Sequence, residues 1–324
     1  MRAVVLESYG GPEVLTIRNV PDPEPGPDEV LVEVAATALN RADLLQRMGL
    51  YPGPPMPREI PGMEFSGTIV GLGTRVRGAS VGDRVMGIVG GGSYAERLTT
   101  HERMLLPVPG TVELADAAAI PEVFITAYDA LVIQGGLTAG RTALVHAGAS
   151  GVGTAAIQIC RALGAEVIVT ASAGKVAACR ELGARLAVDY SRDDFVEAVR
   201  THTDDRGVEV ILDVIGGDYV ARNVACVATN GRIVQVGVMG GGSATVPVGG
   251  LLMKRAQLIG TTLRSRPLEE KIIKSQRVRA EALPWFDRGL VRPIIDSRYA
   301  FDEVAAAQER MGANANVGKI LLTF

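Results

Sequence analysis

The strongest candidate for chemistry in this sequence is a glycine-rich segment near its middle. An apolar, strand-like run at 142–147 leads into residues 148–153, Gly-Ala-Ser-Gly-Val-Gly, and a helix-like segment begins near Val152. Glycines at such a turn let backbone amides approach a pyrophosphate group, which then lies at the positive end of the helix dipole. Because Ser150 replaces the second glycine of the usual dinucleotide fingerprint, a glycine-rich turn without a ligand stays open as the alternative.

The residues that follow the next strand, 166–171, indicate which dinucleotide would bind. Enzymes that use NAD usually carry Asp or Glu at this place, about 20 residues beyond the fingerprint, to bond the ribose hydroxyls. This sequence has Ser172 and Lys175 instead. A hydroxyl and a cationic side chain suit a 2′-phosphate, and no carboxylate is present to repel it. The segment therefore predicts NADPH, with a solvated surface lysine as the alternative interpretation of Lys175.

Two further strand ends, at 214–217 and 236–240, also carry glycines. They fall where later strands of the same sheet should end, and ligands bind at that edge of doubly wound sheets. We expect them to pack against the nicotinamide half of the cofactor. A purely structural turn is an equally good interpretation of the first.

The elements that must position these residues follow two patterns. The first third of the chain consists of short strand-like runs between turns rich in proline and glycine, at 2–6, 15–20, 30–38, 67–71 and 84–88. From Asp116, where a helix is expected over 116–134, helices and strands alternate, which predicts a parallel sheet with helices on both faces. Further helices are expected at 268–288 and 301–311, and a closing strand at 319–324. We expect this tail to return to the β-rich domain, with the Rossmann unit inserted between its two parts.

Composition narrows the class of protein. The chain has 324 residues, 47% of them apolar and 21% charged, which is typical of a globular protein with two domains. A net charge of -3 without a run of Lys and Arg argues against a nucleic-acid partner. Cys160, Cys179 and Cys226 are too scattered for a disulfide framework or a CxxC motif. Without a signal pattern or a membrane-length apolar run, we expect a cytoplasmic protein with no membrane partner.

Three longer motifs carry a family resemblance: Ala-Leu-Asn-Arg-Ala-Asp-Leu at 38–44, the segment from His146 to Gln158, and Leu-Arg-Ser-Arg at 263–266. Together with the rest of the chain they resemble the zinc-free quinone oxidoreductase branch of the medium-chain dehydrogenase/reductase family, which includes zeta-crystallin. Within that branch they look like the tumour-suppressor-inducible quinone oxidoreductases of animals and their bacterial relatives. The resemblance implies an α/β fold in which a Rossmann doubly wound parallel sheet, at 122–265, binds NADPH. This sheet would be inserted in a β-rich GroES-like catalytic domain formed by 1–121 and 266–324.

The resemblance also implies a set of site residues. The pyrophosphate would be held by Ser150, Gly151 and Val152, and the adenosine phosphate by Ser172, Lys175 and Tyr190. The nicotinamide cleft between the domains would be lined by Asn40, Tyr51, Thr126, Gly237, Val238 and Met239, and closed from the tail by Asn316 and Lys319. Without the resemblance, Asn40 is equally well a turn-forming residue and Tyr51 a loop aromatic half covered by prolines.

A metal site is not expected. Zinc alcohol dehydrogenases of the same superfamily carry a Cys near position 40, a Gly-His-Glu segment near 62 and a lobe with four closely spaced cysteines. This sequence has Asn40 and then Gly-Met-Glu at 62–64, and its first cysteine is Cys160. The nitrogen and sulfur ligands that tetrahedral zinc requires are therefore missing from the expected positions.

The predicted function is NADPH-dependent reduction of a quinone. Without a metal or an acid–base pair, the protein's task is to hold the nicotinamide C4 against an electrophile and to exclude water. A quinone is a good acceptor whose reduced oxygens can take protons from water. Reduction of α,β-unsaturated carbonyls, with Tyr51 as proton donor or polarising group, stays open as a rival. A non-catalytic role as an NADPH-binding protein is the rival from another class.

A homodimer is expected. The apolar, strand-like segments 244–248 and 257–263 near the Rossmann edge could pair across a two-fold axis, as in the family.

Overall fold

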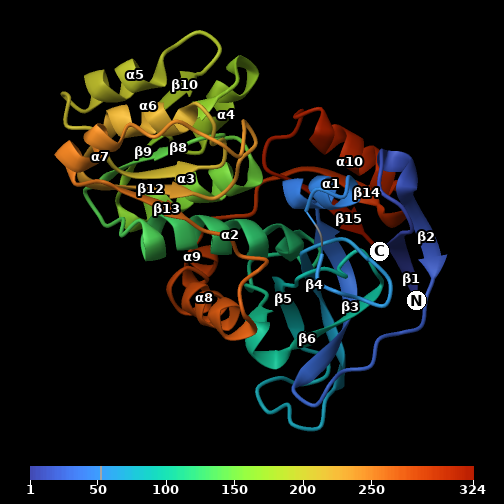
Figure 1. The fold of residues 1–324 in the computed structure, drawn as a ribbon. Helices are drawn as coiled ribbons and strands as arrows, with labels where there is room; N and C mark the ends of the chain where they lie inside the picture. Colours follow the sequence, from blue (N-terminus) through green and yellow to red (C-terminus); the bar gives the residue numbers. More distant parts are fainter. Residues whose placement is uncertain (52) are drawn as a thin grey trace. The chain divides into compact units, whose positions relative to one another are not determined.

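The computed structural model describes residues 1–51 and 53–324, which form two compact units. Met1–Glu122 and Arg264–Phe324 together make one of them, which we call the split unit, and Val123–Leu263 makes the inserted unit. Both are drawn in Figure 1. The expected fold class is confirmed, because the split unit is β-rich and the inserted unit contains a parallel sheet.

The sheet of the inserted unit has six parallel strands: β8 Thr142–Val145, β9 Glu166–Ala171, β10 Leu186–Asp189, β11 Val208–Asp213, β12 Val227–Gln235 and β13 Gln257–Gly260. Their spatial order is β10-β9-β8-β11-β12-β13. Counted from β8, this is the order 3-2-1-4-5-6 of the Rossmann fold. The order in which successive strands are added to the sheet changes side between β8 and β11, which is the topological switch point. All strands run the same way, so the loops after them emerge at one edge, which we call the carboxyl edge.

Helices cover both faces of this sheet: α3 Gly151–Leu163, α4 Val176–Glu181, α5 Phe195–His202, α6 Tyr219–Cys226 and α7 Val248–Lys254. The α5–α6 side carries a buried cluster in which Phe195 and Val224 pack with Leu144 and Ile211 of the strands. Figure 1 shows α3 on the other side of the sheet. Because both faces are covered, the strands read as nearly continuous apolar runs in the sequence.

The split unit is built on a mostly antiparallel sheet: β14 Ile295–Ala300, β15 Lys319–Thr323, β3 Glu29–Ala38, β4 Glu64–Leu72, β5 Arg84–Ile88 and β7 Leu106–Pro107, with β6 Arg97–His101 also paired to β3. A separate hairpin joins β1 Arg2–Leu6 to β2 Leu15–Asn19. The helices are α1 Arg41–Arg47, α8 Leu268–Glu281, α9 Pro284–Asp287 and α10 Val304–Gly312. Short 3-10 turns lie at Pro12–Val14, Glu102–Met104, Asp116–Ala119 and Phe301–Glu303.

The C-terminal strand β15 pairs with β3 through Leu321 and Ala38. This antiparallel pairing places the start of β15 beside the end of β3, so that residues near Lys319 meet residues near Asn40. The expected return of the tail to the β-rich part of the chain is therefore what positions two of the candidate site residues.

Proline interrupts two helices that we expected to be continuous. The segment 116–134 divides into a 3-10 turn, helix α2 at Pro121–Tyr128 and a π-helical turn at Asp129–Gln134. The segment 268–288 divides into α8 and α9, and Pro284 is the first residue of α9. Proline lacks an N–H group and so cannot continue the hydrogen bonds of the preceding turn, but its fixed φ suits the first turn of a helix, so a new helix starts at both places.

One strand prediction was wrong. Residues 244–247 form no strand, and Val248 begins helix α7, whereas Gln257–Gly260 does form β13. Pro247, directly before the helix, cannot donate to a sheet ladder and starts the helix instead.

Candidate functional site

The glycine turn lies between β8 and α3, at the carboxyl edge of the inserted sheet. A side chain on Gly148 would place its Cβ 2.6 Å from the Cβ of Val169, and one on Gly153 would lie 2.3 Å from the Ala147 carbonyl oxygen. Both positions therefore need glycine for steric reasons. Ser150 caps α3, because its Oγ accepts a hydrogen bond from the Gly153 amide at 3.0 Å. The first residues of α3 are only partly buried, so the positive end of a long helix can reach an anion.

The candidates for the adenosine phosphate follow the next two strands. Ser172 and Lys175 come directly after β9, and Tyr190 comes directly after β10. These strands are neighbours in the sheet, with Ala171 opposite Asp189, so the three residues belong to one stretch of the carboxyl edge. The nearby Asp189 carboxylate accepts hydrogen bonds from the amide and hydroxyl of Ser191, at 3.0 and 2.7 Å. The hydroxyl group of Ser172 and the ammonium group of Lys175 are both partly exposed, so they can bind a phosphate group here.

The segment Gly237–Met239 lies beyond β12 and pairs with the loop after β11. The Met239 amide donates to the Val214 carbonyl oxygen at 3.2 Å, and the Gly240 amide donates to that of Ile215 at 2.7 Å. The side chains of Val238 and Met239 are 55% and 53% exposed. Large apolar side chains on a loop that is held by backbone hydrogen bonds offer a surface against which a flat ring can pack.

A buried network of hydrogen bonds connects the ends of the strands that precede these loops. The imidazole of His146 is hydrogen-bonded to Asn223 at 2.8 Å and to Thr170 at 3.0 Å, and the Asn223 amide donates to Asp213 at 2.8 Å. The other oxygen of Asp213 accepts the backbone amides of Ile215 and Gly216, at 2.5 and 3.0 Å. Burial lowers the pKa of His146, which keeps the imidazole neutral. The network therefore holds the strand ends in register and provides no acid.

In the split unit, the candidates Lys319 and Asn40 are in direct contact. The Lys319 Nζ lies 2.7 Å from Glu64 Oε1, 2.8 Å from Asn40 Oδ1 and 2.5 Å from the Leu39 carbonyl oxygen. The Asn40 amide also donates to Glu64 Oε1 at 2.8 Å. The side chains of Lys319 and Glu64 are 4% and 0% exposed. A buried ion pair of this kind is stable only when hydrogen bonds satisfy the remaining polar atoms, as they do here.

Two more carboxyl groups adjoin this pair. Asp43 Oδ2 accepts hydrogen bonds from the backbone amide of Asn40 at 2.8 Å and from the Tyr94 hydroxyl at 3.0 Å. Burial raises the pKa of Asp43 to about 6. Burial and the neighbouring charge of Glu64 raise the pKa of Glu122 to about 8. The Glu122 backbone amide donates to Glu64 Oε2 at 2.8 Å.

The loop of Tyr51 is held by Arg264. The Arg264 guanidinium donates to the Gly90 carbonyl and to Gln46 Oε1, each at 2.7 Å, and to the Tyr51 carbonyl at 3.4 Å. The same guanidinium lies 5.1 Å from the centre of the Tyr51 ring, within the range of a cation–π interaction. Arg264 therefore positions Tyr51 through both its backbone and its ring.

The last two candidates are Asn316 and Thr126. Asn316 is buried in the turn before β15, and its side-chain amide donates to the Gly318 carbonyl at 2.7 Å. Thr126 is partly buried on α2, one helical turn beyond Glu122. Asn316 thus shapes the entry to β15.

Sequence reasoning missed the roles of Glu64, Glu122, Asp43 and Arg264. Glu122 looks like an ordinary first-turn acidic residue of a helix, and Asp43 like the acidic member of a capping motif after Asn40. The motifs at 38–44 and 263–266 contained Asp43 and Arg264 but were used only for the family resemblance, and the Gly-Met-Glu segment at 62–64 drew attention to Met63 rather than to Glu64.

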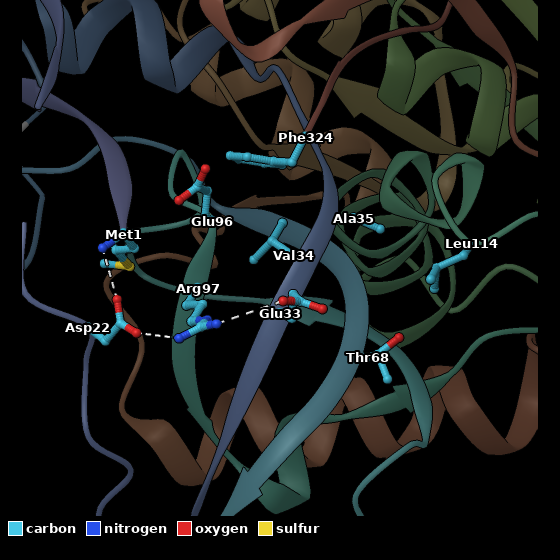
Figure 2. Close-up of a pocket in the computed structure, with 10 residues that line it drawn as sticks. All are labelled: Met1, Asp22, Glu33, Val34, Ala35, Thr68, Glu96, Arg97, Leu114 and Phe324. Atoms are coloured by element: carbon cyan, nitrogen blue, oxygen red, sulfur yellow. Dashed lines mark hydrogen bonds and ion pairs between the residues drawn. The ribbon is translucent and has the colours of Figure 1, made fainter. Parts of the chain in front are cut away.

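A separate pocket of about 630 Å³ lies in the split unit (Figure 2). Figure 2 shows Asp22 between the Met1 amino group and Arg97, with Arg97 directed toward Glu33. Met1, Asp22, Arg97 and Glu33 thus form a chain of ion pairs, Glu96 is paired with Arg2 outside the pocket, and none of the described residues that line the pocket is a candidate site residue.

Neither a metal cluster nor a membrane span is found in the part of the chain that the structure describes. Nowhere in it do three or more His, Cys, Asp or Glu side chains gather closely enough to hold a metal ion. Every helix in residues 1–51 and 53–324 is too short or too polar to cross a bilayer.

Two protein-family profiles match the chain. Residues 26–110 match the alcohol dehydrogenase GroES-like domain, and residues 151–280 match the family described as zinc-binding dehydrogenase. The second description contrasts with the side chains at 40 and 63, where Asn and Met stand in place of zinc ligands.

Similar proteins span nearly the whole chain. A quinone oxidoreductase of Pseudomonas aeruginosa is 33% identical over 99% of this chain and 99% of its own length. The synaptic vesicle membrane protein VAT-1 homolog of Homo sapiens is 32% identical over 99% of this chain and 86% of its own length. Among solved structures, Escherichia coli quinone oxidoreductase complexed with NADPH superposes with a TM-score of 0.90 at 27% identity, with 100% of both chains covered.

Proposed function

The chain is an oxidoreductase of the medium-chain dehydrogenase/reductase family, and we propose that it uses NADPH to reduce quinones without a metal ion. The observation that carries this proposal is the carboxyl edge of the inserted sheet, where the start of α3, Ser172 and Lys175 offer three anion-binding groups in adjacent loops. A dinucleotide with an extra phosphate uses all three.

The described residues fit such a cofactor. Ser150, Gly151 and Val152 would hold the pyrophosphate through the amides of the first turn of α3, and Gly148 and Gly153 leave the close approach free of side chains. Ser172, Lys175 and Tyr190 would surround the 2′-phosphate. Gly237, Val238 and Met239 would pack against the nicotinamide. When bound, NADPH supplies a hydride from its C4 atom.

Asn40, Tyr51 and Thr126 would line the nicotinamide cleft, and Asn316 and Lys319 would close it from the tail. Arg264 fixes Tyr51, and Lys319 fixes Asn40, so these side chains are held in place before a substrate arrives. A quinone needs orientation more than chemical activation, and fixed side chains supply orientation. The names of the Pseudomonas aeruginosa and Escherichia coli proteins support this substrate class.

Metal independence is supported by the position of a buried cation. The Lys319 ammonium contacts Asn40, which stands where zinc enzymes of the superfamily place a ligand, and Glu64, the residue directly after Met63. A divalent cation at this place would be repelled by the ammonium group at close range in a poorly solvated environment. We expect activity to survive extensive dialysis against a chelator. Stoichiometric zinc, with activity lost on its removal, would contradict the proposal.

A homodimer is proposed from the exposed side chains of α7 and its neighbouring edge strand. Val248, Leu252 and Met253 are 69%, 74% and 78% exposed, and β13 ends the sheet. Apolar surface beside an open strand edge is typical of a self-association face. We expect light scattering to give twice the chain mass of 34.0 kDa. Leu252→Asp should produce monomers, whereas Ile273→Asp, at a similarly exposed position on α8, should not.

The deciding experiment for the activity compares two acceptors. NADPH oxidation is followed with 1,2-naphthoquinone and with an α,β-unsaturated aldehyde, using the same preparation. Faster turnover of the quinone supports the proposed function. Faster turnover of the aldehyde would support an alkene reductase, in which a carbon centre must be protonated. No turnover with either acceptor would support a role in binding alone.

A further inference from the structure

Three buried side chains of the inserted unit form a chain of hydrogen bonds from the end of β8 to the end of β11. The imidazole Nε2 of His146 lies 2.8 Å from Asn223 Oδ1, and Asn223 Nδ2 lies 2.8 Å from Asp213 Oδ2. All three side chains are fully buried, and the rings of Phe195 and Tyr219 pack against the imidazole with centroids 4.8 Å away. Because solvent is kept away, each polar atom depends on its neighbour in the chain for a partner.

The direction of these hydrogen bonds follows from Asp213, whose Oδ1 accepts two backbone amides of the loop after β11. An ionised carboxylate only accepts hydrogen bonds, so the amino group of Asn223 donates to it and the carbonyl oxygen of Asn223 faces His146. Burial lowers the pKa of His146, so the ring is neutral and a single nitrogen carries its proton. That nitrogen must be Nε2, and Nδ1 then accepts from the Thr170 hydroxyl, 3.0 Å away.

Asp213 also joins two loops at the carboxyl edge. Its carboxylate holds the loop after β11, and its backbone carbonyl accepts the amide of Val236, directly after β12, at 2.7 Å. The two loops lie in contact, since a Cβ on Gly216 would be 2.9 Å from the Gly241 carbonyl oxygen. The second loop carries Gly237–Met239, the candidates for the nicotinamide side. One buried carboxylate therefore supports this segment from both loops.

We propose that Asp213 is a positioning residue for the nicotinamide, and that Asn223 and His146 hold its carboxylate in the orientation that this role requires. The inference rests on the proposed function, because it assigns Gly237–Met239 to the nicotinamide side of a bound NADPH. Asp213 acts through the two loops, since its side chain is fully buried. A shift of the hydride donor by about 1 Å can lower the rate of transfer by about a hundredfold, so the support of this loop has a measurable effect on kcat.

The first test reads the direction of the chain in the cofactor-free protein. The sequence contains 3 histidines, so nitrogen NMR of protein labelled only in its histidines can resolve them. His101→Gln and His202→Gln identify the other two signals. His146 should be neutral at neutral pH, with its proton on Nε2. A proton on Nδ1 in the wild type, or a doubly protonated ring, would overturn the inference.

Asp213→Asn should reverse the chain. The amide oxygen of the new side chain still accepts the two backbone amides, so its amino group meets the amino group of Asn223. Asn223 must then turn over, its amino group faces Nε2, and the proton of His146 moves to Nδ1. The control is Glu209→Gln on the same strand, where the carboxylate accepts the Thr142 amide at 2.9 Å at the opposite edge of the sheet. The control should keep the proton on Nε2, and a proton that stays on Nε2 in Asp213→Asn would contradict the proposed direction.

The second test separates the two halves of the cofactor. Asp213→Asn should lower kcat with NADPH by about a hundredfold, whereas the affinity for adenosine 2′,5′-bisphosphate, which lacks the nicotinamide, should stay the same. A protein that had lost its fold would lose both. Adding Asn223→Asp should recover most of the kcat, because a carboxylate at position 223 accepts from His146 Nε2 and from the amide at position 213. Equal losses of kcat and of bisphosphate affinity, without recovery in the double variant, would overturn the inference.

The measurements separate the inference from the proposed function. If the wild type reduces neither acceptor, the proposed function is wrong, and binding then decides the inference. In that case Asp213→Asn should weaken the binding of NADPH and spare that of the bisphosphate, and equal affinities would contradict it. If the wild type is active and Asp213→Asn keeps its kcat, the proposed function stands and Asp213 does not position the nicotinamide.

Discussion

The two candidate regions handle charge in opposite ways. Along the carboxyl edge of the inserted unit, the start of α3 and the Lys175 side chain remain partly exposed and can receive charge from a ligand. In the split unit, Lys319 and Glu64 are almost completely buried and bind each other. The first region can therefore select a ligand by its phosphates. The second fixes the position of Asn40, and burial there raises the pKa of Asp43 and of Glu122.

The largest expected effect is the difference in stability lost when a buried ion pair and an exposed ion pair are broken. Lys319→Met leaves Glu64 buried without its cation, and breaking a buried pair in this way costs about 3–5 kcal/mol of unfolding free energy. Arg18→Met is the control, because its ion pair with Glu7 is exposed and should contribute less than about 1 kcal/mol. Denaturant unfolding measures both. Equal losses in the two variants would remove the contrast, and adding Glu64→Gln should restore part of the stability of Lys319→Met.

The second prediction tests the carboxyl edge of the inserted unit. Lys175→Ala should weaken NADPH binding by about tenfold to a hundredfold, because a charge-assisted contact to the 2′-phosphate is worth about 1.5–3 kcal/mol. NADH binding should be unchanged. The control is Arg185→Ala, another exposed cation, which precedes β10 at the opposite edge of the sheet. Fluorescence titration with both cofactors gives the answer, and equal losses for NADPH and NADH would make Lys175 structural.

A third variant asks whether the glycine turn depends on close backbone packing. In Gly153→Ala the new Cβ would lie 2.3 Å from the Ala147 carbonyl oxygen, so the turn must shift. We expect a loss of about 1–3 kcal/mol in stability together with weaker NADPH binding. Gly242→Ala, where a Cβ meets nothing within 4 Å, should change stability by less than about 0.5 kcal/mol. A stable Gly153→Ala protein with normal NADPH affinity would contradict this explanation of the turn.

The fourth prediction uses the pH dependence of stability. Burial raises the pKa of Asp43 to about 6, whereas the unfolded chain releases this proton near its ordinary value of 3.8. The folded state therefore holds more protons in this interval, so stability from this group is lost as pH rises, by about 1.4 kcal/mol per pH unit. Asp43→Asn should remove this component, and the exposed variant Asp302→Asn should retain it. Identical pH profiles for wild type and Asp43→Asn would show that Asp43 does not titrate as proposed.

The smallest effect is expected at Tyr51. Tyr51→Phe keeps the ring under Arg264 and removes only the hydroxyl, so quinone kcat should change by less than about tenfold. The KM rises if the hydroxyl orients the substrate. A thousandfold fall in kcat at unchanged NADPH affinity would instead make Tyr51 the proton donor and would favour the alkene reductase.

Local sequence was sufficient where the physical constraint is local. The alternation of helices and strands predicted the parallel sheet, and the apolar strands required cover on both faces. The family resemblance, carried by motifs such as 38–44 and 263–266, is confirmed by relatives that match nearly the whole chain. Predictions were less accurate where proline interrupts a helix or a strand, at Pro121, Pro284 and Pro247.

The split-unit cluster could not be read from the sequence by itself. Lys319 meets Asn40 across 279 positions, and Glu64 reaches both through the pairing of β3 with β4 and β15. The charge state of Glu122 depends on burial and on these neighbours, and neither is written in the residues around it. The sequence determined the fold and the glycine turn, because the spacing of apolar residues and the steric limits of the backbone act over a few residues. Only the tertiary structure decided which carboxyl groups share one lysine, because electrostatic coupling depends on distance in space.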